Sequence, residues 1–73
     1  MKSDFEWLAP YLIGLNPKWT ADTIQSWTNK ESDAISNIPI DVKAKARARS
    51  GLAWARVSPR SEVDRILDKA RKP

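Results

Sequence analysis

The sequence predicts one small, mainly α-helical domain of three to four helices, with a two-stranded basic hairpin as the alternative for one segment. A chain of 73 residues can bury only one modest core, so residues 1–73 are expected to form a single domain. The sequence has no cysteine and no histidine, which removes disulfides and the usual zinc ligands as sources of stability. Its apolar residues recur at helical spacing, and four tryptophans supply much of the material for the core.

The first helix is expected to start near Asp4, because Ser3 and Glu6 have the spacing of a capping box. Pro10 lies inside this segment and removes one backbone donor. We therefore expect a kink or a break there, and an end at Gly14. The apolar residues that this helix would bury are Phe5, Trp7, Leu8, Leu12 and Ile13.

The second helix is expected to run from a cap at Thr20 to about Asn29, with Trp19 packing on Ile24 as a hydrophobic staple. Residues 31–41 mix polar residues with isoleucines and contain Pro39, which favours an extended neighbour. They are expected to form a turn of helix followed by a connector.

Residues 42–49 alternate small and basic side chains, and two interpretations stay open. Alanine, lysine and arginine are good helix formers, which favours a helix. The alternation has the period of a strand, and Ser50-Gly51 could then turn the chain into a second strand over residues 52–57. In that case the basic side chains would line one face of a hairpin.

The last helix has the clearest signals. Ser58 is expected to cap it and Pro59 to take its first position. Val63, Ile66, Leu67 and Ala70 follow at the spacing of one helical face. Asp64 and Asp68 lie one turn apart, and we expect ion pairs within this helix, rather than a metal site, to explain its charges.

Charge divides the chain into two halves of opposite sign. Up to Asp41 there are three lysines and six carboxylates, a net charge of −3. From Val42 onward there are ten lysines and arginines and three carboxylates, a net charge of +7. So dense a group of cations favours an anionic partner. The candidate binding residues are Lys43, Lys45, Arg47, Arg49, Arg56 and Arg60.

The residue types also bear on catalysis and location. Without histidine or cysteine, no set of nucleophile, base and orienting group can be assembled at these spacings, so we expect no enzyme, no cofactor and no metal. No long apolar run or secretory leader is evident, so a cytoplasmic location without a membrane contact is expected.

Most of the tryptophans are expected inside the core, and Trp54 is expected to be partly exposed. The possible protein-contact anchors are Phe5, Trp7 and Trp54.

Residues 54–67, WARVSPRSEVDRIL, resemble the end of the excisionase and MerR-like winged helices, in which a basic wing strand leads into a final helix. This resemblance covers about a fifth of the chain. It implies that the second helix enters the major groove of double-stranded DNA while the wing contacts the backbone. The residues implied for the groove are Thr23, Gln25, Ser26, Asn29 and Lys30, and those implied for the backbone are the cations from Lys43 to Arg56.

Taken together, these features predict a small regulatory protein of a phage or mobile element that controls transcription or recombination by binding DNA. In size and polarised charge the chain also resembles small phage-encoded regulators that bind host RNA polymerase. The alternative function is therefore an inhibitor that blocks transcription initiation. The expected partners are double-stranded DNA, a bacterial RNA polymerase subunit or a recombinase, in the bacterial host cytoplasm, with no small-molecule substrate.

Overall fold

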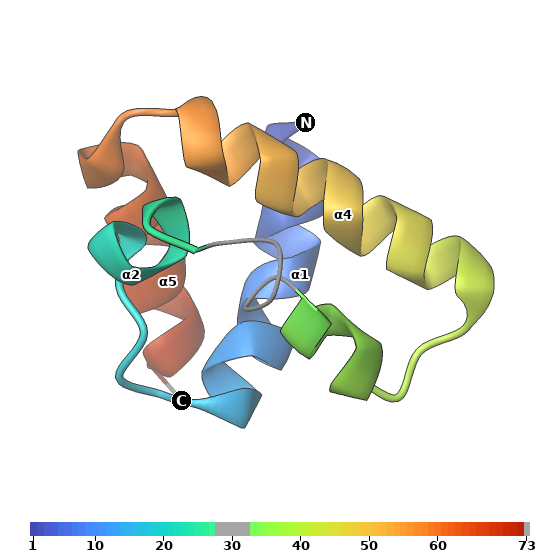
Figure 1. Cartoon of the computed structure of the whole chain (residues 1–73). Helices are drawn as coiled ribbons and strands as arrows, with labels where there is room; N and C mark the ends of the chain where they lie inside the picture. The colour runs from blue at the N-terminus through green and yellow to red at the C-terminus, as the bar shows by residue number, and fades with distance from the viewer. Residues whose placement is uncertain (28–32, 73) are drawn as a thin grey trace.

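Four α-helices and one short 3-10 helix make up the part of the chain that the structure, a computed structural model, describes: residues 1–27 and 33–72. In order these are α1 (Lys2–Leu15), α2 (Ala21–Gln25), the 3-10 helix η1 (Asp33–Asn37), α4 (Val42–Val57) and α5 (Arg60–Arg71). Figure 1 shows α4 crossing α1, with α5 and α2 on the other side of α1 from η1. The prediction of a mainly helical fold is confirmed, and the described residues contain no strand.

The helix α1 runs through Pro10 as one element, so of the two predicted alternatives, a kink or a break, the break is wrong. Pro10 lies on the exposed side of the helix, where its missing donor leaves only the Glu6 carbonyl without its usual partner. The helix also begins earlier than predicted. Met1 is the N-cap, and its carbonyl accepts hydrogen bonds from the Asp4 and Phe5 amides at 3.1 and 3.3 Å, with no side-chain cap. The predicted capping box is therefore absent, and α1 ends at Leu15, one residue beyond Gly14.

The cap of α2 is confirmed, and its length is not. The Thr20 hydroxyl accepts from the Thr23 amide at 3.5 Å, as the sequence predicted. The helix ends at Gln25, whereas the predicted end at Asn29 lies outside the described residues. The turn of helix expected after it is present as η1.

Residues 42–57 form one continuous helix, so the hairpin alternative is wrong. The Asp41 carboxylate caps α4 by accepting from the Ala44 amide at 2.7 Å. A second periodicity lies within the alternation of small and basic residues, because Ala48, Gly51, Leu52 and Ala55 recur at helical spacing and are buried. Helix propensity and this buried stripe therefore outweigh the period of two.

At Gly51, α4 packs directly against the backbone of α1. A Cβ atom at this position would lie 2.7 Å from the Asp4 carbonyl carbon and 2.7 Å from the Phe5 nitrogen. Real Cβ atoms essentially never come so close, so only glycine fits here without a shift of one helix. This contact fixes the position of α4, and of the basic side chains that it carries.

The helix α5 confirms the predicted apolar face: Val63, Ile66 and Leu67 are buried and Ala70 is half-buried. Its start is one residue later than predicted. Pro59 is the N-cap, and the Ser58 hydroxyl donates to the Trp54 carbonyl at 2.6 Å instead of capping α5.

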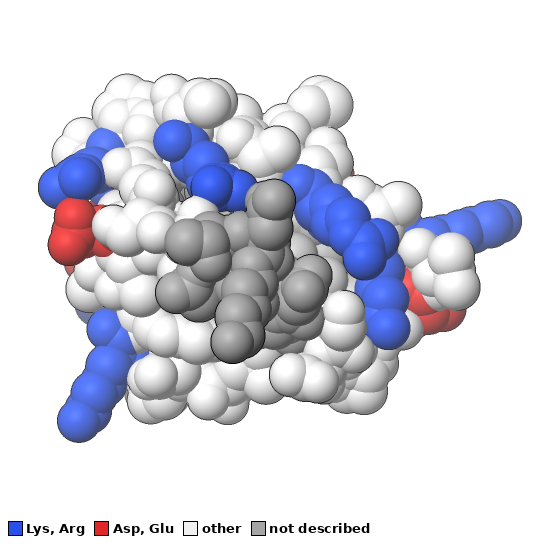
Figure 2. Space-filling model, in the orientation of Figure 1, with Lys and Arg blue, Asp and Glu red and all other residues white. Residues whose placement is uncertain are grey.

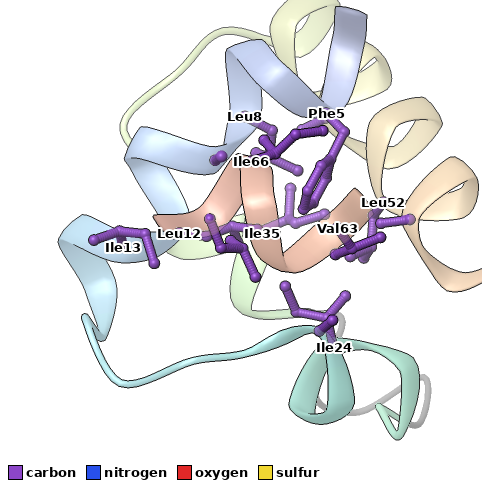
Figure 3. Packing of buried hydrophobic residues seen from close by; sticks show 14 of the residues in the cluster. Phe5, Leu8, Leu12, Ile13, Ile24, Ile35, Leu52, Val63 and Ile66 are labelled. Atoms are coloured by element: carbon purple, nitrogen blue, oxygen red, sulfur yellow. The ribbon is translucent and has the colours of Figure 1, made fainter. Parts of the chain in front are cut away.

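All five elements contribute to one core, and Figure 3 shows their apolar side chains meeting. Phe5, Leu8, Leu12, Ile24 and Leu67 are completely buried. Burying a side chain of this size contributes about 2 kcal/mol, so the core is the main source of stability. None of the helices in residues 1–27 and 33–72 combines the length and the apolar character needed to cross a membrane.

Candidate nucleic-acid interface

The basic side chains of the second half are concentrated on α4. This helix carries five cations and no carboxylate: Lys43, Lys45, Arg47, Arg49 and Arg56. Figure 2 shows lysine and arginine side chains following α4 across the visible face, with the acidic side chains of the described residues near the margins. The described structure thus places five of the six predicted binding residues on one element.

The order of charges on α4 disfavours the helix itself. Lys43 and Lys45 lie near the N-terminus, where the helix dipole favours acidic groups, and the first turn contains no acid. Lys43 and Arg47 are four residues apart, as are Lys45 and Arg49, so like charges repel along the helix. In α5, Glu62 lies in the first turn and the last turn is basic, so its charges complement the dipole. In α4 the Asp41 cap and Arg56 in the last turn do the same, whereas the four cations from Lys43 to Arg49 disfavour their helix.

Arg47 is held by α1. Its Nε donates to the Asp4 carboxylate at 3.0 Å, and its guanidinium lies 4.8 Å from the centre of the Trp7 ring. The Ser50 hydroxyl is 3.3 Å from the other Asp4 oxygen. The hydrogen bond from Arg47 lowers the pKa of Asp4, aided by Ser50 and opposed by desolvation. About half of the Arg47 side chain stays exposed, at 47 %, but Asp4 offsets its charge.

Two further cations of α4 bind carbonyl groups of the segments beside it. The Arg56 Nη2 donates to the Trp27 carbonyl at 2.7 Å, and the Lys45 Nζ is 3.5 Å from the Ser36 carbonyl. Neither Lys45 nor Arg56 forms an ion pair with a carboxylate of residues 1–27 and 33–72. Lys43 and Arg49 are exposed and make no ion pair with the residues that the structure describes.

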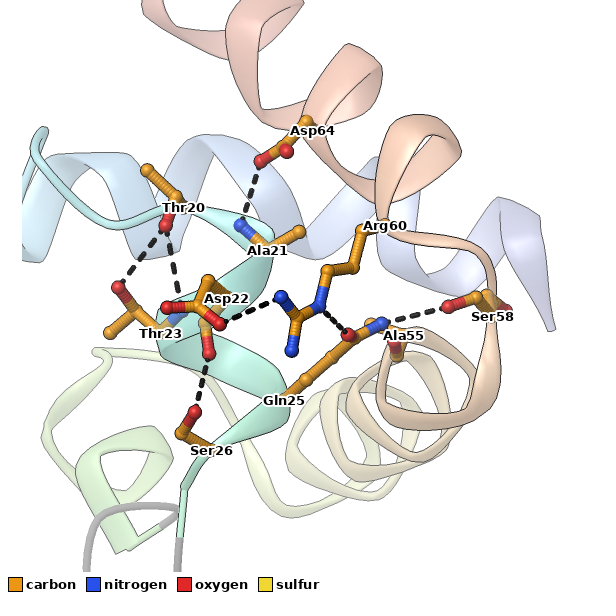
Figure 4. A network of polar contacts seen from close by, with 10 residues as sticks. All are labelled: Thr20, Ala21, Asp22, Thr23, Gln25, Ser26, Ala55, Ser58, Arg60 and Asp64. Atoms are coloured by element: carbon orange, nitrogen blue, oxygen red, sulfur yellow. Dashed lines mark hydrogen bonds and ion pairs between the residues drawn. The ribbon is translucent and has the colours of Figure 1, made fainter.

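Arg60, the sixth predicted residue, lies apart from this group at the start of α5. It forms an ion pair with Asp22 of α2 at 3.0 Å and donates to the Gln25 amide oxygen at 3.0 Å (Figure 4). Its role in the structure is to join α5 to α2. Of the six candidates, Arg47 and Arg60 therefore have acidic partners.

The side chains of α2 that the resemblance assigned to the major groove are engaged within the protein. Gln25 donates to the carbonyls of Ala55 and Ser58 at 3.1 and 2.7 Å, and Ser26 donates to the Asp22 carbonyl at 2.7 Å. The Thr23 hydroxyl lies 3.3 Å from that of Thr20. A helix of five residues with these bonds is poorly suited to enter a groove. Asn29 and Lys30 lie outside the described residues.

Phe5 and Trp54 meet in the interior, where their ring centres are 5.8 Å apart. Phe5 is completely buried, so its predicted role as a contact anchor is wrong. Trp54 is half-buried against the core, and the expected partial exposure is confirmed. Trp7 is also half-buried and stacks at 5.3 Å on Tyr11, which is 38 % exposed. Trp7 and Trp54 are therefore both half-buried, and Trp7 lies between Tyr11 of α1 and Arg47 of α4.

The charges of α5 mostly bond to other helices, contrary to the predicted pairing within α5. Lys2 forms an ion pair with Glu62 at 2.9 Å, and Asp64 accepts from the Ala21 amide at 2.8 Å. Only Asp68 and Arg71 pair along the helix among the described residues. These bonds hold α1 and α2 against α5. Residue spacing within one helix does not predict such contacts between helices.

A groove of about 280 Å³ lies between α1 and α5. Its lining is formed by Glu6, Pro10, Ile66, Lys69 and Ala70. It contains one acid, one base and an apolar floor, and it lies away from the cations of α4.

No family model, no curated protein and no solved structure matches this chain.

Proposed function

We propose that this protein is a non-enzymatic regulator that binds double-stranded DNA through α4 and controls transcription or recombination. The single observation that carries the proposal is the charge of α4: five cations and no carboxylate in sixteen residues. The four from Lys43 to Arg49 weaken the helix, and within the described residues only Arg47 of the five has an acidic partner. An external polyanion accounts for this arrangement, because it would turn the repulsion into attraction.

In this proposal the cations bind phosphates. Lys43, Lys45, Arg49 and Arg56 lack a described acidic partner and would each displace condensed counterions from the duplex. Arg47 would contribute less, since Asp4 already offsets its charge. Phosphate contacts give affinity and orientation rather than sequence preference. The resemblance of residues 54–67 to excisionase-like proteins supports a regulator of a phage or mobile element.

The proposal differs from the winged-helix expectation in its binding element. In a winged helix, α2 would contact the bases and a basic wing would contact the DNA backbone. In the structure the basic segment is a helix, and Gln25 of α2 forms hydrogen bonds within the protein. The proposed contact is therefore centred on α4 alone.

The test compares two variants that each remove two positive charges. Lys43→Gln with Arg49→Gln changes α4, and Arg65→Gln with Lys69→Gln changes exposed positions of α5. Binding of a fluorescent duplex at low salt should weaken about 10-fold or more for the α4 pair and only slightly for the α5 pair. Equal weakening by the two pairs would mean that net charge, rather than a site on α4, governs binding.

A protein partner is the second candidate function, and the contact of the half-buried Trp7 with the exposed Tyr11 favours it. The Trp7 ring lies beside Arg47, so an aromatic and a cationic contact adjoin on α1 and α4. A bacterial RNA polymerase subunit or a recombinase with an acidic patch would fit such a surface. Purified RNA polymerase retained by the wild type and lost with Trp7→Ala, while duplex binding is unaffected, would favour this candidate.

A further inference from the structure

The outer side of α4 is a line of small side chains between two exposed valines. Val42 and Val57 are 84 % and 86 % exposed. Between them, Ala46, Ser50 and Ala53 follow at steps of three or four residues, and all are exposed. At about 100° per residue these positions share one face. Because none is longer than valine, a partner can come close to the α4 backbone along its whole length.

Basic side chains lie on both sides of this line. Lys43 and Arg49 each lie about 60° from its centre, in opposite directions, at the rotation of an ideal helix. Lys45 and Arg56 lie farther round on the same side as Arg49, where they bond to the neighbouring carbonyls. The outer face of α4 thus has small side chains along its middle and cationic side chains along both edges.

These dimensions fit one feature of nucleic acids. The major groove of B-form DNA is about 12 Å wide, admits an α-helix and is bordered by a phosphate backbone on each side. The deep groove of A-form RNA is too narrow for such an entry. A helix of sixteen residues is about 24 Å long at 1.5 Å per residue, enough to follow the groove past several base pairs.

We propose that α4 enters the major groove of duplex DNA, with the line from Val42 to Val57 toward the base edges and the flanking cations on the two backbones. The inference rests on the proposed function and adds the groove, the duplex form and the orientation of the helix. The groups on the line itself are methyls and the Ser50 hydroxyl, which already lies 3.3 Å from the Asp4 carboxylate, so little base preference is expected.

Blocking either groove of the DNA tests the assignment with the unaltered protein. The probe is a mixed-sequence duplex of about 20 base pairs, with guanine N7 either free or methylated, or with a minor-groove ligand such as netropsin bound. We expect N7 methylation to weaken binding about 10-fold and netropsin to leave it nearly unchanged. Loss of binding with netropsin and none with methylation would overturn the proposal.

A bulky residue on the small line supplies the matching change in the protein. Ala53→Leu keeps a good helix former and every cation, and its control, Gly14→Leu, adds the same side chain on the exposed face of α1, where a Cβ meets nothing within 4 Å. Ala53→Leu should weaken duplex binding about 10-fold with its salt dependence retained, and Gly14→Leu should not. Wild-type affinity in Ala53→Leu overturns the groove assignment.

The two proposals fail differently. If the pair Lys43→Gln and Arg49→Gln leaves duplex binding unchanged, the proposed function is wrong and the groove assignment falls with it. If that pair weakens binding but N7 methylation and Ala53→Leu do not, α4 binds phosphates from outside the groove and only this inference is wrong.

Discussion

The contact between Gly51 and α1 gives a sharp prediction, because a single methyl group there meets backbone rather than a flexible side chain. In Gly51→Ala the new Cβ would lie 2.7 Å from two backbone atoms, whereas ordinary contact begins near 3.4 Å. The two helices must therefore move apart by roughly 1 Å. Overpacking of this kind costs up to about 3 kcal/mol. The higher helix propensity of alanine returns about 1 kcal/mol.

The expected net result for Gly51→Ala is a loss of about 2 kcal/mol in the free energy of unfolding. For a domain of this size that corresponds to a melting temperature lower by about 10 °C. Gly14→Ala is the matched control, because a Cβ there meets nothing within 4 Å, and it should gain about 1 kcal/mol. Thermal and urea unfolding followed by circular dichroism measure both. A Gly51→Ala protein as stable as Gly14→Ala would refute the close approach of the helices, and with it the placement of α4.

Three further predictions concern the polar contacts around the interface. Asp4→Asn should lower the melting temperature at neutral pH. Because the pKa of Asp4 is lowered in the fold, its ionised form stabilises the protein above the usual pKa, and this stabilisation is lost as the pH falls through the lowered value. The melting temperatures of the variant and the wild type should therefore converge in acid, and a constant difference across a pH series would contradict this linkage. Gln25→Ala removes bonds to Ala55, Ser58 and Arg60 and should cost about 1 to 2 kcal/mol in urea unfolding, more than Thr23→Ala. Asp41→Ala removes the cap of α4 and should cost about 1 kcal/mol of stability, whereas Asp41→Ser should retain most of it. Because both variants remove a negative charge at the start of α4, both should bind duplex DNA more tightly in a fluorescence titration. Unchanged affinity would count against α4 as the binding element.

Much of the fold follows from local signals in the sequence. The Thr20 cap and the apolar face of α5 were predicted because each depends on residues within two turns of each other. The charged half was equally visible, since a net charge needs no knowledge of contacts. These features predict where the helices and the cations lie in the sequence. They do not predict how the helices pack on one another.

The errors come from contacts between distant residues. Residues 42–49 satisfy a strand period and also favour a helix, and the packing of Ala48, Gly51 and Leu52 in the buried stripe of α4 decides for the helix. Pro10 is tolerated because it lies on the solvent side of α1, which spacing alone left open. The buried stripe of α4 was a usable signal, since Ala48, Leu52 and Ala55 follow one another at steps of four and three residues across the end of the alternation.

The sequence predicted which cations belong to the candidate site, but not which of them form ion pairs within the fold. Lys43 and Arg49 are exposed as expected, whereas Asp4 and Asp22 hold Arg47 and Arg60 from 43 and 38 positions away in the chain. No spacing rule within one helix identifies such pairs. The same holds for Gln25, whose predicted role toward DNA conflicts with its bonds to the end of α4.

The salt dependence of duplex binding tests the central claim most directly. With phosphate contacts from Lys43, Lys45, Arg49 and Arg56, the logarithm of the binding constant should fall with the logarithm of salt concentration with a slope of about −3 to −4. Lys43→Gln with Arg49→Gln should reduce the magnitude of the slope by about 2, and Arg65→Gln with Lys69→Gln should leave it unchanged. The same slope in all three proteins would contradict an interface on α4.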